Sequence, residues 1–186
     1  MHGMTNDWKC PGQRVYTCIA PLLVVIAVGC SLVRATDVHG QSIIGPGEQR
    51  VLQVLGEAIT VKIDGEQTEG KYAVIEVVSP IGGGPPLHLH RHEDEVIYVL
   101  EGEVEFQRGD RRFLAKPGST VFLSRDVPHT FRNVGTTPSK VLAVIVPANF
   151  VGFFEDVHAL AKPTPEQASE VGKKYGLTFL PPPKGD

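Results

Sequence analysis

The spacing of two histidines and a glutamate is the feature that most constrains how this chain can fold. His88 and His90 are two residues apart, so on one strand both side chains point to the same face. Glu95 begins a following apolar segment in which Ile97 and Val99 share its face. The residues between His90 and Glu95 can make a turn that brings the glutamate opposite the histidine pair. The pattern therefore predicts neighbouring strands that direct polar groups into an apolar interior.

A third histidine extends this pattern. His129 lies 34 residues after Glu95 and would enter from a third strand, with Phe131 and Asn133 on its side. Three strands can converge on one point in a closed or folded-over sheet but not in a flat one. Imidazole nitrogens and one carboxylate suit borderline divalent metals. We therefore predict one divalent transition-metal ion, which is Fe, Mn, Ni, Co, Cu or Zn. The predicted metal ligands are His88, His90, Glu95 and His129.

Several neighbouring residues are predicted to have no ligand role. His92 has the spacing of a further ligand if the first strand continues, but a turn there would place it at the rim. The side chains expected to be structural are Tyr98, Phe131 and Asn133. Arg125 and Arg132 are expected to be exposed.

Short segments of alternating or β-branched residues, most of them separated by glycine-containing turns, dominate the middle of the chain. No helical segment interrupts them, so the sheets should be antiparallel. Short strands at this spacing predict a sandwich or a small barrel, here over residues 58–147. The predicted strands are 58–63, 72–78, 95–100, 103–107, 111–114, 120–123, 130–133 and 140–146.

Helices are predicted only in the C-terminal tail, residues 148–186. The first spans 150–160, and its apolar stripe consists of Phe150, Phe153, Phe154, Val157 and Leu160. The second begins after Thr164, which can form a capping box with Gln167, and Pro165 occupies its first position. Both helices are expected to pack against the barrel or across an oligomer interface.

The first 35 residues have the composition of a targeting or anchoring segment. Between Arg14 and Arg34 lie 19 residues without charge, after a short basic stretch. We consider a signal peptide cleaved near Ala35, a lipoprotein leader lipidated at Cys30, an uncleaved membrane anchor and a misassigned start. The predicted domain is exported, to the periplasm, the exterior or the membrane surface, and meets the membrane only through this segment. Residues 36–57 are a predicted N-terminal extension.

Charge and cysteine content exclude several function classes. The formal net charge is −3 and no block of Lys and Arg stands out, so we predict no nucleic-acid partner. All three cysteines precede residue 36. The rest of the chain therefore has no thiolate nucleophile, thiolate ligand or disulfide framework.

The chain resembles the cupin superfamily through two spaced motifs. Every spacing of the first motif is met, and its members are Gly82, His88, His90, Glu95 and Gly102. The second motif is matched by Gly118, His129 and Asn133. Ser124 and Asp126 replace the proline and glycine of its central turn, which affects a turn and not a metal ligand. The resemblance covers about residues 58–147.

The resemblance implies an all-β fold, a small antiparallel jelly-roll barrel with one or two C-terminal helices. It also implies a mononuclear metal near the centre and a homodimer of single-domain chains. The C-terminal segments look like those of bacterial quercetin-dioxygenase-like cupins. The implied function is a metal-dependent dioxygenase, with Glu95 as catalytic base, acting on a small organic substrate. The alternatives are a non-enzymatic small-molecule-binding cupin and a metal-dependent isomerase or epimerase.

Overall fold

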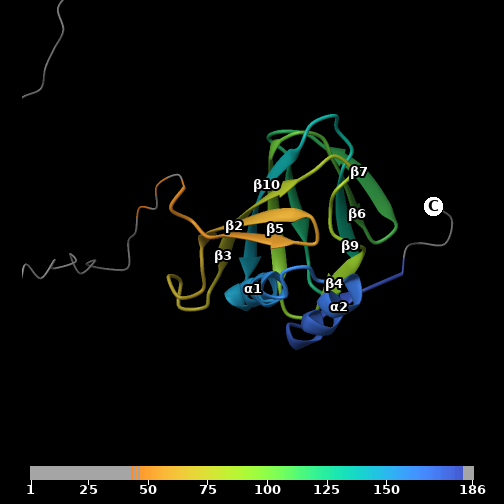
Figure 1. The fold of residues 1–186 in the computed structure, drawn as a ribbon. Helices are drawn as coiled ribbons and strands as arrows, with labels where there is room; N and C mark the ends of the chain where they lie inside the picture. Colours follow the sequence, from red (N-terminus) through yellow and green to blue (C-terminus); the bar gives the residue numbers. More distant parts are fainter. Residues whose placement is uncertain (1–42, 44, 46, 182–186) are drawn as a thin grey trace, which may run out of the picture. The chain divides into compact units, whose positions relative to one another are not determined.

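A computed structural model describes residues 43, 45 and 47–181 (Figure 1). These residues form two antiparallel β-sheets followed by two helices, which is the all-β jelly-roll architecture predicted from the sequence. The predicted leader over 1–35, including Cys30 and the cleavage site near Ala35, lies outside the described residues.

The eleven strands of the described residues divide into a six-stranded and a five-stranded sheet. In spatial order, the first sheet contains β1 (Val51–Val54), β2 (Glu57–Ile63), β3 (Ala73–Ser79), β10 (Ser139–Val146), β5 (Asp94–Glu101) and β8 (Thr120–Leu123). The second contains β11 (Leu177–Phe179), β4 (His88–His90), β9 (His129–Asn133), β6 (Val104–Arg108) and β7 (Arg111–Ala115). Every pairing between neighbours is antiparallel.

The eight predicted strands are all present, with ends within one residue of those expected. Of the remaining three strands, β4 is the strand on which His88 and His90 were predicted to lie, whereas β1, which precedes residue 58, and β11, which follows the helices, were not predicted. Both are only three or four residues long, so their alternation is too short to stand out in the sequence. β1 completes one sheet edge and β11 pairs with β4, the strand of the first two histidines.

Alternation along each strand places one set of side chains between the two sheets. On β5 the buried residues are Glu95, Ile97 and Val99, as the sequence predicted. On β9 they are His129, Phe131 and Asn133. Burial of a large apolar side chain stabilises the fold by roughly 1.5–3 kcal/mol. The strand phase that builds this core also turns the polar residues of β4, β5 and β9 inward.

The two helices lie side by side at one end of the barrel (Figure 1). A single turn of 3-10 helix, η1 (Ala148–Phe150), leads into α1 (Val151–Ala159), which contacts β1. The stripe prediction was wrong at Leu160, which follows the end of α1 and is 41% exposed. In α2 (Pro165–Lys174), Thr164 and Gln167 form the predicted capping box. No helix among the described residues is long and apolar enough to span a membrane.

The loop that leads into β4 is fixed to β9. The Asn133 side chain donates hydrogen bonds to the carbonyl oxygens of Ser79, Pro80 and Thr137 at 2.8–3.1 Å. Gly84 has φ +144°, and a Cβ atom there would lie 2.0 Å from the Phe131 carbonyl oxygen. This close approach requires glycine. The loop therefore sets the position of β4 against β9.

Candidate metal centre

The four predicted ligands meet at one point. Their nearest ligand atoms all lie within 4.8 Å of one another, and all four residues are buried. His88 and His90 come from β4, and His129 lies directly opposite His88 on β9. Glu95 comes from β5 in the other sheet. The cluster therefore joins the two sheets across the interior, as the convergence of three strands requires.

The distances within the cluster match the size of a transition-metal site. Glu95 Oε1 lies 3.8 Å from His90 Nε2, and Glu95 Oε2 lies 3.5 Å from His129 Nε2. The ring centroids of the three histidines are 4.5–5.4 Å apart. Nitrogen and oxygen ligands lie about 2.0–2.2 Å from such an ion. Donor atoms about 3–4 Å apart can therefore share one ion with little movement.

Backbone contacts fix the ring orientation of two histidines. His88 Nδ1 lies 2.7 Å from the Pro86 carbonyl oxygen, and His129 Nδ1 lies 2.8 Å from that of Val127. A carbonyl oxygen only accepts, so each Nδ1 carries the proton and each Nε2 keeps a free lone pair. Among the described residues, the buried His129 Nε2 has no hydrogen-bond partner. Its lone pair is free to bind a metal ion. The chemistry of these residues therefore fits the predicted ion.

Burial and neighbouring charges keep His88 neutral and Glu95 ionised, which are the protonation states that bind a metal ion. Burial, followed by the neighbouring His129 and His90, lowers the pKa of His88 to about 3. Burial opposes ionisation of Glu95, but His90, His129 and His88 together lower the pKa of that carboxyl to about 2. At neutral pH the cluster thus offers a neutral imidazole beside an anionic carboxylate, which is the state that binds a cation.

A second buried carboxyl, Glu93, was not predicted from the sequence. Its Oε2 atom lies 3.5 Å from His90 Nδ1, and the two side chains are 3% and 1% exposed. Both atoms lack a hydrogen bond among the described residues. A carboxylate on the far side of a metal-binding imidazole fixes its orientation and raises its basicity. The missed signal is spacing, because Glu93 has the same parity as Glu95, Ile97 and Val99.

Replacing Glu93 by Gln is therefore expected to weaken metal binding by about 10- to 100-fold while the fold is retained. The amide keeps the volume of the side chain but loses the charge that faces His90. Titration with Co²⁺ or Zn²⁺ measures the change, and Glu101→Gln, an exposed position on β5, is the matched control. Equal affinities for the two variants would show that Glu93 does not support His90.

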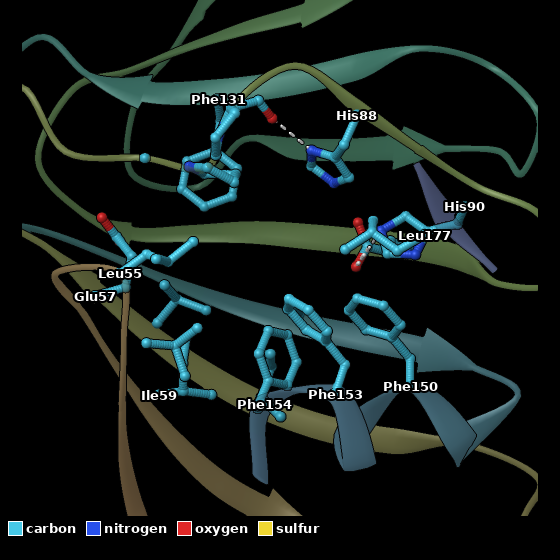
Figure 2. A pocket seen from close by; sticks show the side chains of 18 of the residues that line it. Leu55, Glu57, Ile59, His88, His90, Phe131, Phe150, Phe153, Phe154 and Leu177 are labelled. Atoms are coloured by element: carbon cyan, nitrogen blue, oxygen red, sulfur yellow. Dashed lines mark hydrogen bonds and ion pairs between the residues drawn. The ribbon is translucent and has the colours of Figure 1, made fainter. Parts of the chain in front are cut away.

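The cluster forms part of the wall of an apolar cavity of about 90 Å³. Figure 2 shows Phe131 on one side of the cavity and Phe150, Phe153 and Phe154 on the other. Phe150 also packs edge-on against His90, with ring centroids 4.3 Å apart. The aromatic residues at the start of α1, predicted only as a packing stripe, therefore line the space beside the candidate metal ligands. A chemical group bound in this space would therefore contact both the aromatic side chains and an ion held by the candidate ligands.

The other sequence predictions near the site have mixed outcomes. His92 is exposed and outside the cluster, as predicted. Arg125 is exposed and pairs with Asp94. Phe131, expected to be only structural, lines the cavity. Asp126 replaces the family's turn glycine and has φ +60°, a conformation that aspartate tolerates better than most residues.

Acid should destabilise the metal-free protein. His88 in the unfolded chain takes up a proton near its ordinary pKa of 6.5, whereas the folded residue does so only near pKa 3. The contribution of neutral His88 to the free energy of unfolding is therefore fully present above about pH 6.5. It is lost as the pH falls towards the folded pKa of about 3. Urea unfolding between about pH 7 and 4 should show this loss, and His88→Gln should flatten it. His92→Gln is the exposed control; identical pH profiles for wild type and His88→Gln would contradict the assignment.

Comparison with known proteins agrees with this architecture. Residues 75–145 match the family model of the cupin domain. The chain is 34% identical over 67 residues to the oxalate-binding protein of Thermotoga maritima, a match that covers 36% of this chain and 55% of that protein. It is 26% identical over 89 residues to quercetin 2,3-dioxygenase of Bacillus subtilis, covering 48% of this chain and 26% of that enzyme. The chain thus spans less than two thirds of either relative.

A solved structure supports the fold independently. The crystal structure of a predicted oxalate decarboxylase from Thermotoga maritima superposes with a TM-score of 0.52 at 24% identity. The match covers 57% of this chain and 99% of that one. At this identity the likeness shows the fold alone, and the jelly-roll prediction is confirmed.

Proposed function

We propose that the protein is a metal-dependent oxidoreductase of the dioxygenase type, because residues 75–145 match the cupin-domain family model and carry a buried cluster of three histidines and a glutamate. The observation that carries the proposal is that all four candidate ligands line the apolar cavity. A molecule in that cavity would contact both the aromatic wall and the metal centre. The likeness to quercetin 2,3-dioxygenase supports this reaction class.

A redox-active ion held by the four candidate ligands would supply the reactivity towards O₂. The chain contributes a proton acceptor, Glu95, whose carboxylate oxygens can take the proton of a substrate hydroxyl. The pKa of Glu95 is low because of the neighbouring imidazoles. Turning away from His90 and His129 would raise that pKa and make Glu95 a stronger base. The phenylalanines of η1 and α1 would exclude water from the same space.

A second candidate is a metal-loaded protein that binds a small molecule without turnover. The similarity to an oxalate-binding protein favours this candidate. Oxalate itself suits the cavity poorly, because no Lys or Arg is present among the described residues that line it. The predicted metal ion would offset part of the charge of a dianion there, but Glu95 already neutralises part of that ion's charge and no cationic side chain among the described lining residues assists it. Export and a homodimeric state, both predicted from the sequence, stay predictions.

Oxygen consumption by the metal-loaded protein tests the proposal. Protein reconstituted separately with Fe²⁺, Mn²⁺, Ni²⁺, Co²⁺ or Cu²⁺ is incubated with a flavonol, a 1,3-diketone and a catechol. We expect O₂ uptake with at least one metal and substrate, and its loss in Glu95→Gln. Tight binding of such molecules without O₂ uptake under any metal would instead favour the binding protein.

A further inference from the structure

Glu57 is a carboxyl in the cavity that the metal centre does not use. It begins β2, is 6% exposed and lines the same cavity as the four candidate ligands. In Figure 2, Glu57 and Leu55 lie on the side of the cavity away from His88 and His90. Glu57 is not a member of the metal cluster found among the described residues. The cavity wall therefore carries a second polar group, Glu57, apart from the candidate metal ligands.

Two protein groups hold the Glu57 carboxyl in place. The Ser79 hydroxyl donates a hydrogen bond to Glu57 Oε2, and the backbone of Gly84 provides a second hydrogen bond. Burial raises the pKa of Glu57, and these two contacts oppose the rise. A carboxylate has about four acceptor positions. Two protein donors therefore leave acceptor capacity that a bound molecule can use.

The rest of the cavity wall selects against charge. Apart from Glu57 and the candidate metal ligands, the described lining side chains are apolar. No Lys or Arg stands among these residues to neutralise an anion. A divalent ion would offset the charge of Glu95, but a Glu57 carboxylate, away from that ion, would repel an anionic group at its end of the cavity, since unpaired buried charge is costly. The cavity is therefore suited to a neutral molecule with an apolar body.

We propose that the cavity binds a neutral, mainly apolar molecule that has a metal-binding atom at one end and a hydroxyl at the other, with the hydroxyl donating a hydrogen bond to Glu57. This inference rests on the proposed function, because it takes the same cavity as the substrate site. It adds the substrate class and assigns Glu57 the role of a specificity-determining residue. The alternative role, holding the loop before β4, would not distinguish one ligand from another.

The test compares a parent ligand with its hydroxylated isomers. The probes are 4-phenylimidazole, whose imidazole binds metal, and its ortho-, meta- and para-hydroxyphenyl derivatives. Calorimetry measures their affinity for Co²⁺-loaded wild type, Glu57→Gln and Ser79→Ala. Glutamine can retain the contacts with Ser79 and with the Gly84 backbone, because the Ser79 hydroxyl can also accept a hydrogen bond. Ser79→Ala removes the contact of Glu57 with β3 but keeps the carboxyl.

We expect at least one hydroxylated isomer to bind wild type about tenfold more tightly than the parent, the strength of a hydrogen bond to a charged group. Glu57→Gln should reduce that advantage, measured against the parent ligand in the same variant, about fivefold or more, while Ser79→Ala preserves the advantage. An advantage that is absent, or that survives in Glu57→Gln, overturns the inference but not the proposed function. Failure of every probe to bind the metal-loaded protein counts against both.

Discussion

Replacing His129 by Ala is expected to lower transition-metal affinity by about 100-fold or more, so that the purified variant contains almost no metal. His129 is the candidate ligand on β9, and its Nε2 atom is 3.5 Å from Glu95 Oε2 and lacks a hydrogen-bond partner among the described residues. Losing a direct ligand should cost more than losing a residue that only orients one, which costs about 10- to 100-fold. Competition with a chromophoric chelator measures the affinity.

Two further variants make this result specific. His90→Ala removes a ligand from β4 and should behave like His129→Ala. His92→Ala removes an exposed imidazole close to β4 in sequence and should retain the affinity of wild type. Circular dichroism and thermal unfolding of the metal-free proteins establish that each variant is folded. Wild-type affinity in either ligand variant would refute the assigned site.

Replacing Gly84 by Ala is expected to reduce the free energy of unfolding by about 3 kcal/mol or more. The new Cβ atom would lie 2.0 Å from the carbonyl oxygen of Phe131 and 3.1 Å from the Cα atom of Arg132. Both neighbours are backbone atoms of β9, which cannot move without shifting His129. Metal affinity should therefore fall together with stability. Urea unfolding and Co²⁺ titration measure the two effects.

Gly109→Ala is the matched control for this substitution. Gly109 has φ +58°, and no atom of the described residues beyond its chain neighbours lies within 4 Å of where an added Cβ atom would be. Only the backbone conformation therefore opposes alanine, at a cost of about 1 kcal/mol. Its position in the β6–β7 turn should leave metal affinity unchanged. Equal destabilisation by the two substitutions would show that the contact between Gly84 and β9 is not what requires glycine.

The sequence predicted most of the fold and the convergence of four side chains in a cluster suited to a metal ion, because both depend on strand parity. Ile97 and Val99 fixed the inward face of β5, and Glu95 shares their phase. The contribution of β11 could not be predicted this way. Its three residues are too short to show a period, and their pairing with β4 depends on how α1 and α2 return the chain to the barrel.

The burial of Glu57 and Glu93 could not be predicted from the sequence, for a different reason. Glu57 has the parity of the buried residues of β2, and Glu93, directly before β5, has the parity of the buried residues of β5, yet acidic residues are most often exposed. Whether such a carboxyl is buried depends on a partner distant in sequence, such as Ser79 for Glu57. The position of Phe154 in the cavity wall was not predicted either. A helical apolar stripe indicates packing but does not show that part of the packed surface is left open as a cavity.

X-ray absorption spectroscopy of the protein loaded with one equivalent of Co²⁺ tests the central claim most directly. The account predicts that one ion binds and that its first shell contains three imidazole nitrogens and at least one oxygen at about 2.0–2.2 Å. The multiple scattering of imidazole rings counts the histidines, and His129→Ala should remove one of them or abolish binding. No bound ion, or a shell with fewer than three imidazoles in wild type, would contradict the assignment of His88, His90, Glu95 and His129 as one metal centre.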